Sequence, residues 1–278
     1  MCPTTACTPV AGWYSAMHDP SRTGLPAMPF TPLVVIPVYD HQHAIGAVVR
    51  GVIDSGLPCL LVDDGSHAGC AQVLDALAAA HAPQVTLLRL PANQGKGGAM
   101  LAGFAAAAGR GHSHVLQIDA DGQHDPGDIP RFVALARQHP GAVICGIPVY
   151  DASVPKARLY GRYATHVWVW INTLSLQIRD SMCGFRVYPL APVTGLVGEE
   201  TIGRRMDFDS EILVRLFWRE VAVINLPTRV TYPSDGVSHF DVWRDNVRIS
   251  GMHTRLFFGM LRRAPRLLWR HLRGATPA

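Results

Sequence analysis

Two aspartates two residues apart are the side chains in this sequence best suited to chemistry. They stand in Asp119-Ala120-Asp121-Gly122-Gln123-His124, directly after a short apolar run. Carboxylate oxygens are ligands that Mg²⁺ and Mn²⁺ prefer, and the amide oxygen of Gln123 can reach the same ion. A divalent cation held there would withdraw charge from a departing phosphate. A solvated acidic turn is the alternative interpretation, because isolated Asp-x-Asp sequences are common.

Two further segments carry groups that suit a nucleotide diphosphate. Asp63 and Asp64 end another apolar run, where a carboxylate can accept hydrogen bonds from a ribose or a base. An ordinary Asp-Gly turn is the alternative. The segment Asn93-Gln94-Gly95-Lys96-Gly97-Gly98 combines glycines, which allow close backbone approach, with a cation at the predicted start of a helix. Lys96 is one of two lysines in a chain with twenty-three arginines, and a solvated loop lysine is its alternative.

The segments between these motifs predict an α/β fold. Short apolar runs typical of buried strands alternate with helical stretches. The predicted strands are Leu33–Val38, Cys59–Asp63, Val85–Leu90, Val115–Asp119 and Val143–Cys145. The predicted helices are His43–Ser55, Gln72–Ala80, Gly98–Ala108 and Ile129–Gln138. This alternation predicts a Rossmann-like, mostly parallel sheet with helices on both faces, whose ligands bind at the carboxyl ends of the strands.

The second half of the chain is less regular. We expect a long helix over Arg158–Ile178, a turn at Cys183-Gly184-Phe185-Arg186, a helix over about Asp209–Arg219 and a strand over about Val221–Leu226. The aromatic stripe around Trp168 and Trp170 in the long helix suits contact with lipid or packing in the core equally well.

Length and composition favour one large domain with a modest extension. The chain has 278 residues, of which 48% are hydrophobic and 17% charged, and this balance excludes a disordered chain. We divide it into an extended lead-in at 1–30, a main domain at 31–240 and a helical tail at 241–278. The six cysteines form no Cys-x-x-Cys pair, so a zinc site is not expected and the pattern suits a reducing cytoplasm. No signal peptide and no membrane-spanning helix are predicted.

The tail concentrates the positive charge of the chain. Seven arginines follow Asp245 without another acid, so the residues before them carry about −3 of the total net charge of +4. These arginines alternate with apolar side chains, which predicts a basic amphipathic helical extension lying on an anionic membrane surface. Pro265 is predicted to split it into two short pieces. The alternative is a helix packed over the sheet with its arginines in water.

In this order and spacing the motifs resemble the family 2 inverting glycosyltransferases of the GT-A fold, above all the dolichol- and polyprenyl-phosphate sugar transferases. The resemblance runs from Leu33 to about Arg229. A fainter one links Arg244–Met260 to glycosyltransferases of bacterial aryl-polyene and xanthomonadin pigment clusters. The nucleotide-sugar contacts that the resemblance implies are Pro37, Tyr39, Asp40, Asp63, Asp64, Lys96 and Asp119. It also implies a metal site at Asp119, Asp121 and Gln123, and acceptor contacts at Arg158, Arg162 and Arg186.

The sequence departs from the family pattern at three places. Asp40-His41 stands where an Asn-Glu pair is usual, and Asp125 interrupts the expected pair of prolines. Gly146-Ile147-Pro148 replaces a Gly-Ser-Arg segment whose arginine binds the acceptor phosphate in the family.

We therefore expect an inverting glycosyltransferase that moves a sugar from a UDP- or GDP-linked donor to a lipid-linked or lipophilic acceptor, with Mg²⁺ or Mn²⁺ as cofactor. Asp121, Asp209 and Arg186 are the predicted catalytic residues. Asp209, with Asp207 second, is the candidate base for a hydroxyl or carboxylic acid acceptor, whereas a phosphate acceptor needs none. Helix capping is the alternative role of both.

The expected partners are the nucleotide-sugar, the lipid-linked acceptor and an anionic membrane, at the inner face of the cytoplasmic membrane. A catalytically silent membrane-associated scaffold and a sugar-nucleotidyltransferase are the rival functions. The second would show a glycine-rich loop near the first strand, where Pro37–His43 has no glycine. Nucleic-acid binding through the arginine tail is disfavoured by its interleaved apolar residues.

Overall fold

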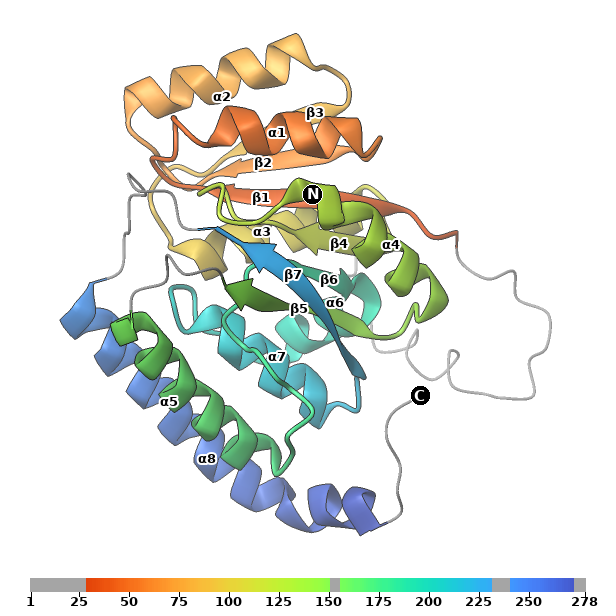
Figure 1. Ribbon diagram of the computed structural model, residues 1–278, viewed down its shortest axis with the longest axis vertical. Helices are drawn as coiled ribbons and strands as arrows, with labels where there is room; N and C mark the ends of the chain where they lie inside the picture. The colour runs from red at the N-terminus through yellow and green to blue at the C-terminus, as the bar shows by residue number, and fades with distance from the viewer. Residues whose placement is uncertain (1–28, 151–155, 232–240, 273–278) are drawn as a thin grey trace, which may run out of the picture.

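A seven-stranded sheet forms the centre of the molecule (Figure 1). The computed structural model describes residues 29–150, 156–231 and 241–272, so nearly all of the predicted lead-in at 1–30 lies outside the described residues. The strands of the sheet lie in the order β3-β2-β1-β4-β6-β5-β7. They are β1 (Pro32–Val38), β2 (Cys59–Asp63), β3 (Val85–Arg89), β4 (His114–Gln117), β5 (Val143–Tyr150), β6 (Arg186–Pro189) and β7 (Val223–Val230).

The predicted mostly parallel sheet with helices on both faces is confirmed. Of the described strands, β6 alone runs antiparallel to its neighbours β4 and β5. The other paired strands are parallel, so their carboxyl ends lie along one edge. The described helices are α1 (Ile45–Asp54), α2 (Ala68–Ala80), α3 (Lys96–Gly109), α4 (Ile129–Gln138), α5 (Lys156–Thr173), α6 (Leu190–Glu199), α7 (Phe208–Trp218) and α8 (Val242–Leu272).

Side chains on the two faces of the sheet build two apolar cores. Successive residues of a strand point to opposite faces. Thus Val34 and Ile36 join the core under α1, α2 and α4, while Leu33 and Val35 join the core under α3, α6 and α7. Each fully buried side chain of this size stabilises the fold by about 1.5–3 kcal/mol. The long helices α5 and α8 lie side by side outside α7 (Figure 1).

The structure differs from the sequence prediction most in the second half. The predicted turn at Cys183–Arg186 leads directly into β6 and α6, neither of which was predicted. A strand of four residues that begins with an arginine gives almost no apolar signal, although all four side chains are buried. The helix predicted to reach Ile178 ends at Thr173, because Leu174 takes a left-handed backbone conformation with φ of 50°.

Pro265 does not split the tail, contrary to the prediction. Helix α8 runs without interruption from Val242 to Leu272. A proline inside a helix removes one hydrogen bond and costs about 3 kcal/mol. Leu267 beyond the proline is buried in the same core as Leu256 and Met260 before it, so packing on both sides stabilises the continuous helix. No helix in the described part of the chain is long and apolar enough to cross a bilayer.

Candidate functional site

A half-buried lysine bridges two carboxylates at the carboxyl edge of the sheet. Lys96, in the first turn of α3, places its Nζ 2.8 Å from Oδ2 of Asp119 and 2.8 Å from Oδ2 of Asp209. Asp119 follows β4, and Asp209 lies in the first turn of α7. Burial lowers the pKa of Lys96, but the two carboxylates outweigh it and hold the pKa well above the ordinary value. The ammonium group therefore stays charged and fixes the positions of both acids.

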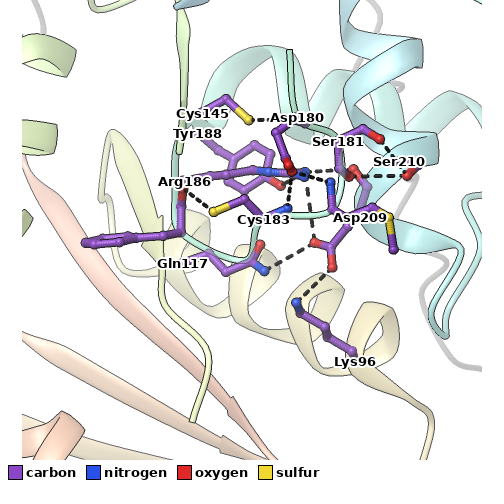
Figure 2. A network of polar contacts seen from close by, with 12 residues as sticks. Lys96, Gln117, Cys145, Asp180, Ser181, Cys183, Arg186, Tyr188, Asp209 and Ser210 are labelled. Atoms are coloured by element: carbon purple, nitrogen blue, oxygen red, sulfur yellow. Dashed lines mark hydrogen bonds and ion pairs between the residues drawn. The ribbon is translucent and has the colours of Figure 1, made fainter. Parts of the chain in front are cut away.

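Polar side chains of β4 and β6 lie beside Asp209, opposite Lys96 (Figure 2). Gln117 donates from Nε2 to Oδ1 of Asp209 over 3.2 Å. Arg186, opposite Gln117 in the sheet, donates from Nη1 to the main-chain oxygen of Asp209 over 2.7 Å and to the hydroxyl of Tyr188 over 3.0 Å. No side-chain hydrogen bond from Asp207 caps α7. The side chain of Asp209 is bound by Lys96 and Gln117, so it belongs to the polar network of the site and does not cap α7.

The prediction that Arg186 contacts the acceptor is corrected by its position. The side chain lies in β6 and is completely buried, so no substrate reaches it in this arrangement. Its Nε and Nη2 have no partner within the described residues. Arg186 instead holds the backbone at Asp209, which makes it a positioning residue.

Asp119 and Asp121 form an acidic pair with unused acceptor capacity. Oδ1 of Asp119 is buried and has no hydrogen-bond partner among the described residues. Burial raises the pKa of Asp119, but Lys96 outweighs it and the pKa is lowered. The pKa of Asp121 is raised, first by burial and then by the charge of Asp119. Asp119 thus has a cationic partner in Lys96, whereas the raised pKa of Asp121 indicates that the charge of this second carboxylate is less fully compensated.

This donor set fits a divalent cation. Carboxylate oxygens suit Mg²⁺ or Mn²⁺. Within the described residues no three His, Cys, Asp or Glu side chains gather into a metal-binding group, so Gln123, donor phosphates or water must complete the coordination. Gln123 lies next to the pair, with its backbone N–H donating to Oδ1 of Asp121 over 3.0 Å.

Asp63 and Asp64 lie in a different environment from the one predicted for nucleotide contacts. Asp63 is completely buried and accepts hydrogen bonds from the Ser66 N–H at 2.9 Å and from Arg89 Nε at 2.8 Å. Asp64 accepts from the backbone N–H groups of Gln94 at 2.7 Å and Gly95 at 2.8 Å. The amides predicted to cradle a phosphate therefore bind the protein's own Asp64. In this arrangement Asp64 positions the loop that carries Lys96, and Asp63 joins the loop after β2 to Arg89 of β3.

The remaining predicted donor contacts lie at the end of β1. Pro37 is buried inside the strand, and Tyr39 is half-buried just after it. Asp40 takes a left-handed backbone conformation with φ of 57° and accepts the His67 N–H at 2.8 Å. Asp40 thus joins the loop after β1 to the first residue before α2, at the same edge as Lys96.

Of the two predicted acceptor arginines in α5, Arg162 has a partner within the protein. Arg162 forms two hydrogen bonds to Asp180, at 2.6 Å from Nε and 2.8 Å from Nη2, and is mostly buried. Its charge therefore serves Asp180 rather than an exposed acceptor site. Arg158 lies in α5, and its side chain falls outside the described residues. Oδ1 of Asp180 accepts the N–H of Cys183 at 2.7 Å, which holds the turn against the acidic pair.

Comparisons with known proteins identify the chain. The family described as "Glycosyl transferase family 2" matches residues 33–192, more than half of the sequence. The chain belongs to glycosyl transferase family 2. It is therefore a glycosyltransferase, and the resemblance noted in the sequence is confirmed.

Two relatives of this glycosyltransferase act on polyprenyl substrates by name. The polyprenol monophosphomannose synthase of Mycolicibacterium smegmatis is 27% identical over 220 residues, covering 74% of this chain and 79% of the relative. The undecaprenyl-phosphate 4-deoxy-4-formamido-L-arabinose transferase of Sodalis glossinidius is 37% identical over 111 residues, covering 38% of this chain and 33% of the relative. The chain thus spans only about a third of the length of this second relative.

A solved structure shares the fold. Glucosyl-3-phosphoglycerate synthase from Mycobacterium tuberculosis, in complex with Mn²⁺, UDP-glucose and phosphoglyceric acid, superimposes with a TM-score of 0.56. The two proteins are 17% identical, and the match covers 83% of this chain and 78% of the other. At this identity the likeness concerns the fold alone, and it agrees with the expected GT-A architecture.

Several residues of the glycosyltransferase site were missed from the sequence. Gln117 stands two residues before Asp119, so the period-2 alternation of a strand already placed both on one face. Gly184 lies so close to Asp119 that an added Cβ would collide with the carboxylate. Arg204 and Arg205 are exposed beside the glycine-rich loop and hydrogen-bond Gln94 and Asn93. Two adjacent arginines before a predicted helix were a usable signal. Gly184 was placed in the predicted turn, but its residue type did not show the contact with Asp119.

Proposed function

We propose that this glycosyltransferase transfers a sugar from a UDP- or GDP-linked donor to a polyprenyl phosphate, with inversion at the anomeric carbon and with a divalent cation bound at Asp119, Asp121 and Gln123. The observation that carries the proposal is the unpartnered buried oxygen of Asp119 beside Asp121, within the part of the chain that the structure describes. A bound cation would stabilise the negative charge that develops on the leaving nucleoside diphosphate.

The protein groups supply orientation and electrostatics. Lys96 and the exposed Arg204 and Arg205 place positive charge along the loop where a diphosphate would lie. Fixed charges of this kind stabilise a developing anion without reorganising during the reaction. The Cys183–Gly184 turn, held by Asp180, packs directly against Asp119 and so sets how close an acceptor can approach.

The state of Asp209 supports a phosphate acceptor. Its carboxylate is bound by Lys96 at 2.8 Å and by Gln117 at 3.2 Å. Both carboxylate oxygens of Asp209 therefore already have a donor from the protein, which leaves Asp209 poorly placed to act as a general base. A phosphate acceptor is already an anion and attacks without one. The names of the two relatives also refer to polyprenol monophosphomannose and to undecaprenyl phosphate.

The acceptor also determines where the reaction takes place. A polyprenyl chain partitions into a bilayer, so transfer would occur at a membrane surface. We place the enzyme at the inner face of the cytoplasmic membrane, attached peripherally.

The test is direct transfer by the full chain. Purified protein is incubated with labelled UDP- and GDP-sugars, undecaprenyl phosphate and Mn²⁺ or Mg²⁺, and label is followed into the organic phase. The expected product is a sugar phosphate lipid whose anomeric configuration, read by NMR, is opposite to that of the donor. EDTA should abolish its formation.

Three results would contradict the proposal. Retention of configuration would exclude a single displacement. The absence of both donor binding and transfer across the panel would favour the silent scaffold. Pyrophosphate-dependent formation of nucleotide-sugar from a sugar phosphate would favour a nucleotidyltransferase.

A further inference from the structure

Helix α8 has three distinct faces. One face is buried against the body and carries Met252, Leu256, Met260 and Leu267. Trp168 of α5 lies 5.9 Å from His253 and 6.5 Å from Phe257 between ring centroids, so α5 covers one side of this face. The sequence alternative, a helix packed over the sheet, therefore holds for this inner face. It does not explain the residues on the outward faces.

The second face is apolar and exposed. Six large apolar side chains are exposed along almost the whole length of the helix, on the side away from its buried face. They are Trp243, Val247, Phe258, Leu261, Leu268 and Trp269, exposed by 50–79%. At 100° per residue they fall within about 100° of one another around the helix axis. We call these six residues the apolar strip.

The third face is basic. Arg244, Arg248, Arg255, Arg262 and Arg266 fall within about 40° of one another, beside the apolar strip. We call them the arginine strip. The expectation that no acid lies near the tail arginines is corrected. Arg248 pairs with Asp245 at 3.0 Å, Arg266 with Glu220 at 2.8 Å, and Arg255 lies 3.6 Å from Glu211. Their side chains nevertheless remain 44–66% exposed, and Arg244 is 76% exposed.

The apolar surface continues onto α5. Tyr163, Val167 and Ile171 follow each other at intervals of four residues, so they share one helix face, and all three are exposed. Trp168 beside them is exposed by 43% and reaches α8 through Phe257, whose ring lies 5.8 Å from Phe258 of the apolar strip. The two helices thus present one continuous apolar surface with a basic margin.

We propose that this α5–α8 surface docks flat on an anionic lipid bilayer, with the apolar strip in the headgroup boundary and the arginine strip against anionic headgroups. Apolar and arginine residues on adjacent faces of one helix are the arrangement that binds bilayer interfaces. The proposal rests on the proposed function only for the presence of a lipid-linked acceptor. It specifies which face of the enzyme meets the membrane.

The position of the site agrees with this orientation. Arg162 precedes Tyr163 in α5 and binds Asp180, which in turn holds the Cys183–Gly184 turn against Asp119. Tyr163, the first residue of the exposed apolar surface on α5, is therefore adjacent to Arg162. A series of contacts connects Arg162, through Asp180 and the turn, to Asp119 of the acidic pair. A polyprenyl phosphate extracted from a docked bilayer would approach from this side.

The first test is flotation of the full chain with phosphatidylcholine vesicles that contain or lack phosphatidylglycerol. Phe258→Ser with Leu261→Ser should weaken binding at least about tenfold, because two half-exposed side chains lose their burial in the interface. The matched control is Val149→Ser, which is 53% exposed and lies on β5 instead of on either helix. Arg244→Gln with Arg262→Gln should weaken binding to anionic vesicles about 30-fold, from about fivefold for each arginine. Arg50→Gln on α1, on the opposite face of the sheet, is the charge control and should bind like the wild type.

The second test reads insertion itself. Vesicles with brominated acyl chains quench indoles at the bilayer interface. Trp243→Phe and Trp269→Phe should remove most of the quenching, whereas Trp218→Phe, at a buried position, should not.

The outcomes separate the alternatives. Unchanged vesicle binding in both double variants overturns the proposal, as does equal binding to vesicles with and without phosphatidylglycerol. Dimers in vesicle-free solution that dissociate in the Phe258 and Leu261 variant would assign the surface to a second copy of the chain. Donor binding by calorimetry is measured in parallel. Vesicle binding without donor binding would refute the proposed function and leave the docking surface standing.

Discussion

The two acidic pairs at the carboxyl edge look alike in sequence and differ in what surrounds their oxygens. Asp63 is the last residue of β2 and Asp64 follows it. Each of the two carboxylates accepts two hydrogen bonds from protein groups. Asp119 and Asp121 follow β4 only two strands away. There Lys96 binds one oxygen of Asp119, and the other is buried without a partner among the described residues.

This difference distinguishes carboxylates that stabilise the protein's own loops from carboxylates that can bind a ligand. A buried acceptor without a donor is costly, so we expect its partner to come from outside the chain, as an ion, a ligand or an ordered water. The pair at β2 stabilises a loop; the pair at β4 retains free coordination capacity. Variants of each pair should therefore affect different measurements.

Asp121→Ala should have the largest effect of the variants proposed here, and we expect it to lower the rate of turnover. The cation would lose an anionic ligand, and transfer should fall by about 10²–10³-fold, the range for loss of one electrostatic contact to a developing anion. The measurement is the initial rate of sugar transfer over a titration of Mn²⁺. The fold should persist because the residue lies in a loop at a strand end. Full activity of this variant in EDTA would exclude a catalytic metal ion at this site.

Asp64→Asn should instead act on stability. The variant replaces one carboxylate oxygen by an NH₂ group, which would face the backbone N–H of Gln94 or Gly95. We expect the free energy of unfolding in denaturant to fall by about 1–3 kcal/mol. Asp121→Asn is the matched control and should show no such loss. Equal losses in the two variants would erase the distinction between the pairs.

Much of this edge was predictable because strand periodicity is a local property. Apolar runs located β1, β2 and β3 within a residue or two, and parallel pairing then brought the motifs to one edge. What the sequence could not show is which donors satisfy each carboxylate, since Gln94, Gly95 and Lys96 approach Asp64 and Asp119 only through tertiary contact. The prediction for the buried Arg186 failed for the same reason. Its charge suggests a ligand contact, and only the packing of β6 between β4 and β5 shows that it is enclosed.

Lys96→Met tests the electrostatics that link the pairs. Lys96 places a positive charge 2.8 Å from Asp119, where it competes with a divalent cation. Its removal should tighten Mn²⁺ binding in the absence of donor by about tenfold and weaken donor binding. Titration calorimetry or the Mn²⁺ resonance signal measures the first effect. Lys156→Met changes the other lysine of the chain and should leave both affinities unchanged. Weaker Mn²⁺ binding in the Lys96 variant would show that the lysine supports the cation instead of competing with it.

The smallest effect expected is a change of sign in the pH dependence of stability. The pKa of Asp121 is raised in the folded protein, by burial and by Asp119. Its contribution to stability is therefore full below the unfolded pKa and is lost as the pH rises through the folded pKa. The pKa of Asp63 is lowered, because Ser66 and Arg89 outweigh the effect of burial. Its contribution is full above the unfolded pKa and is lost as the pH falls through the folded pKa.

Asp121→Asn should accordingly raise the free energy of unfolding at pH 7 and give no gain at pH 3, whereas Asp63→Asn should lower it at pH 7. Denaturant titrations in EDTA at the two pH values measure both. Mn²⁺ should then reverse the order of wild type and Asp121→Asn at pH 7, because a cation that binds the folded wild type stabilises it and the neutral amide of the variant offers no charge to hold it. A loss of stability for Asp121→Asn at pH 7 in EDTA would mean that protein donors stabilise this carboxylate as they stabilise that of Asp64, and would assign both pairs to the scaffold.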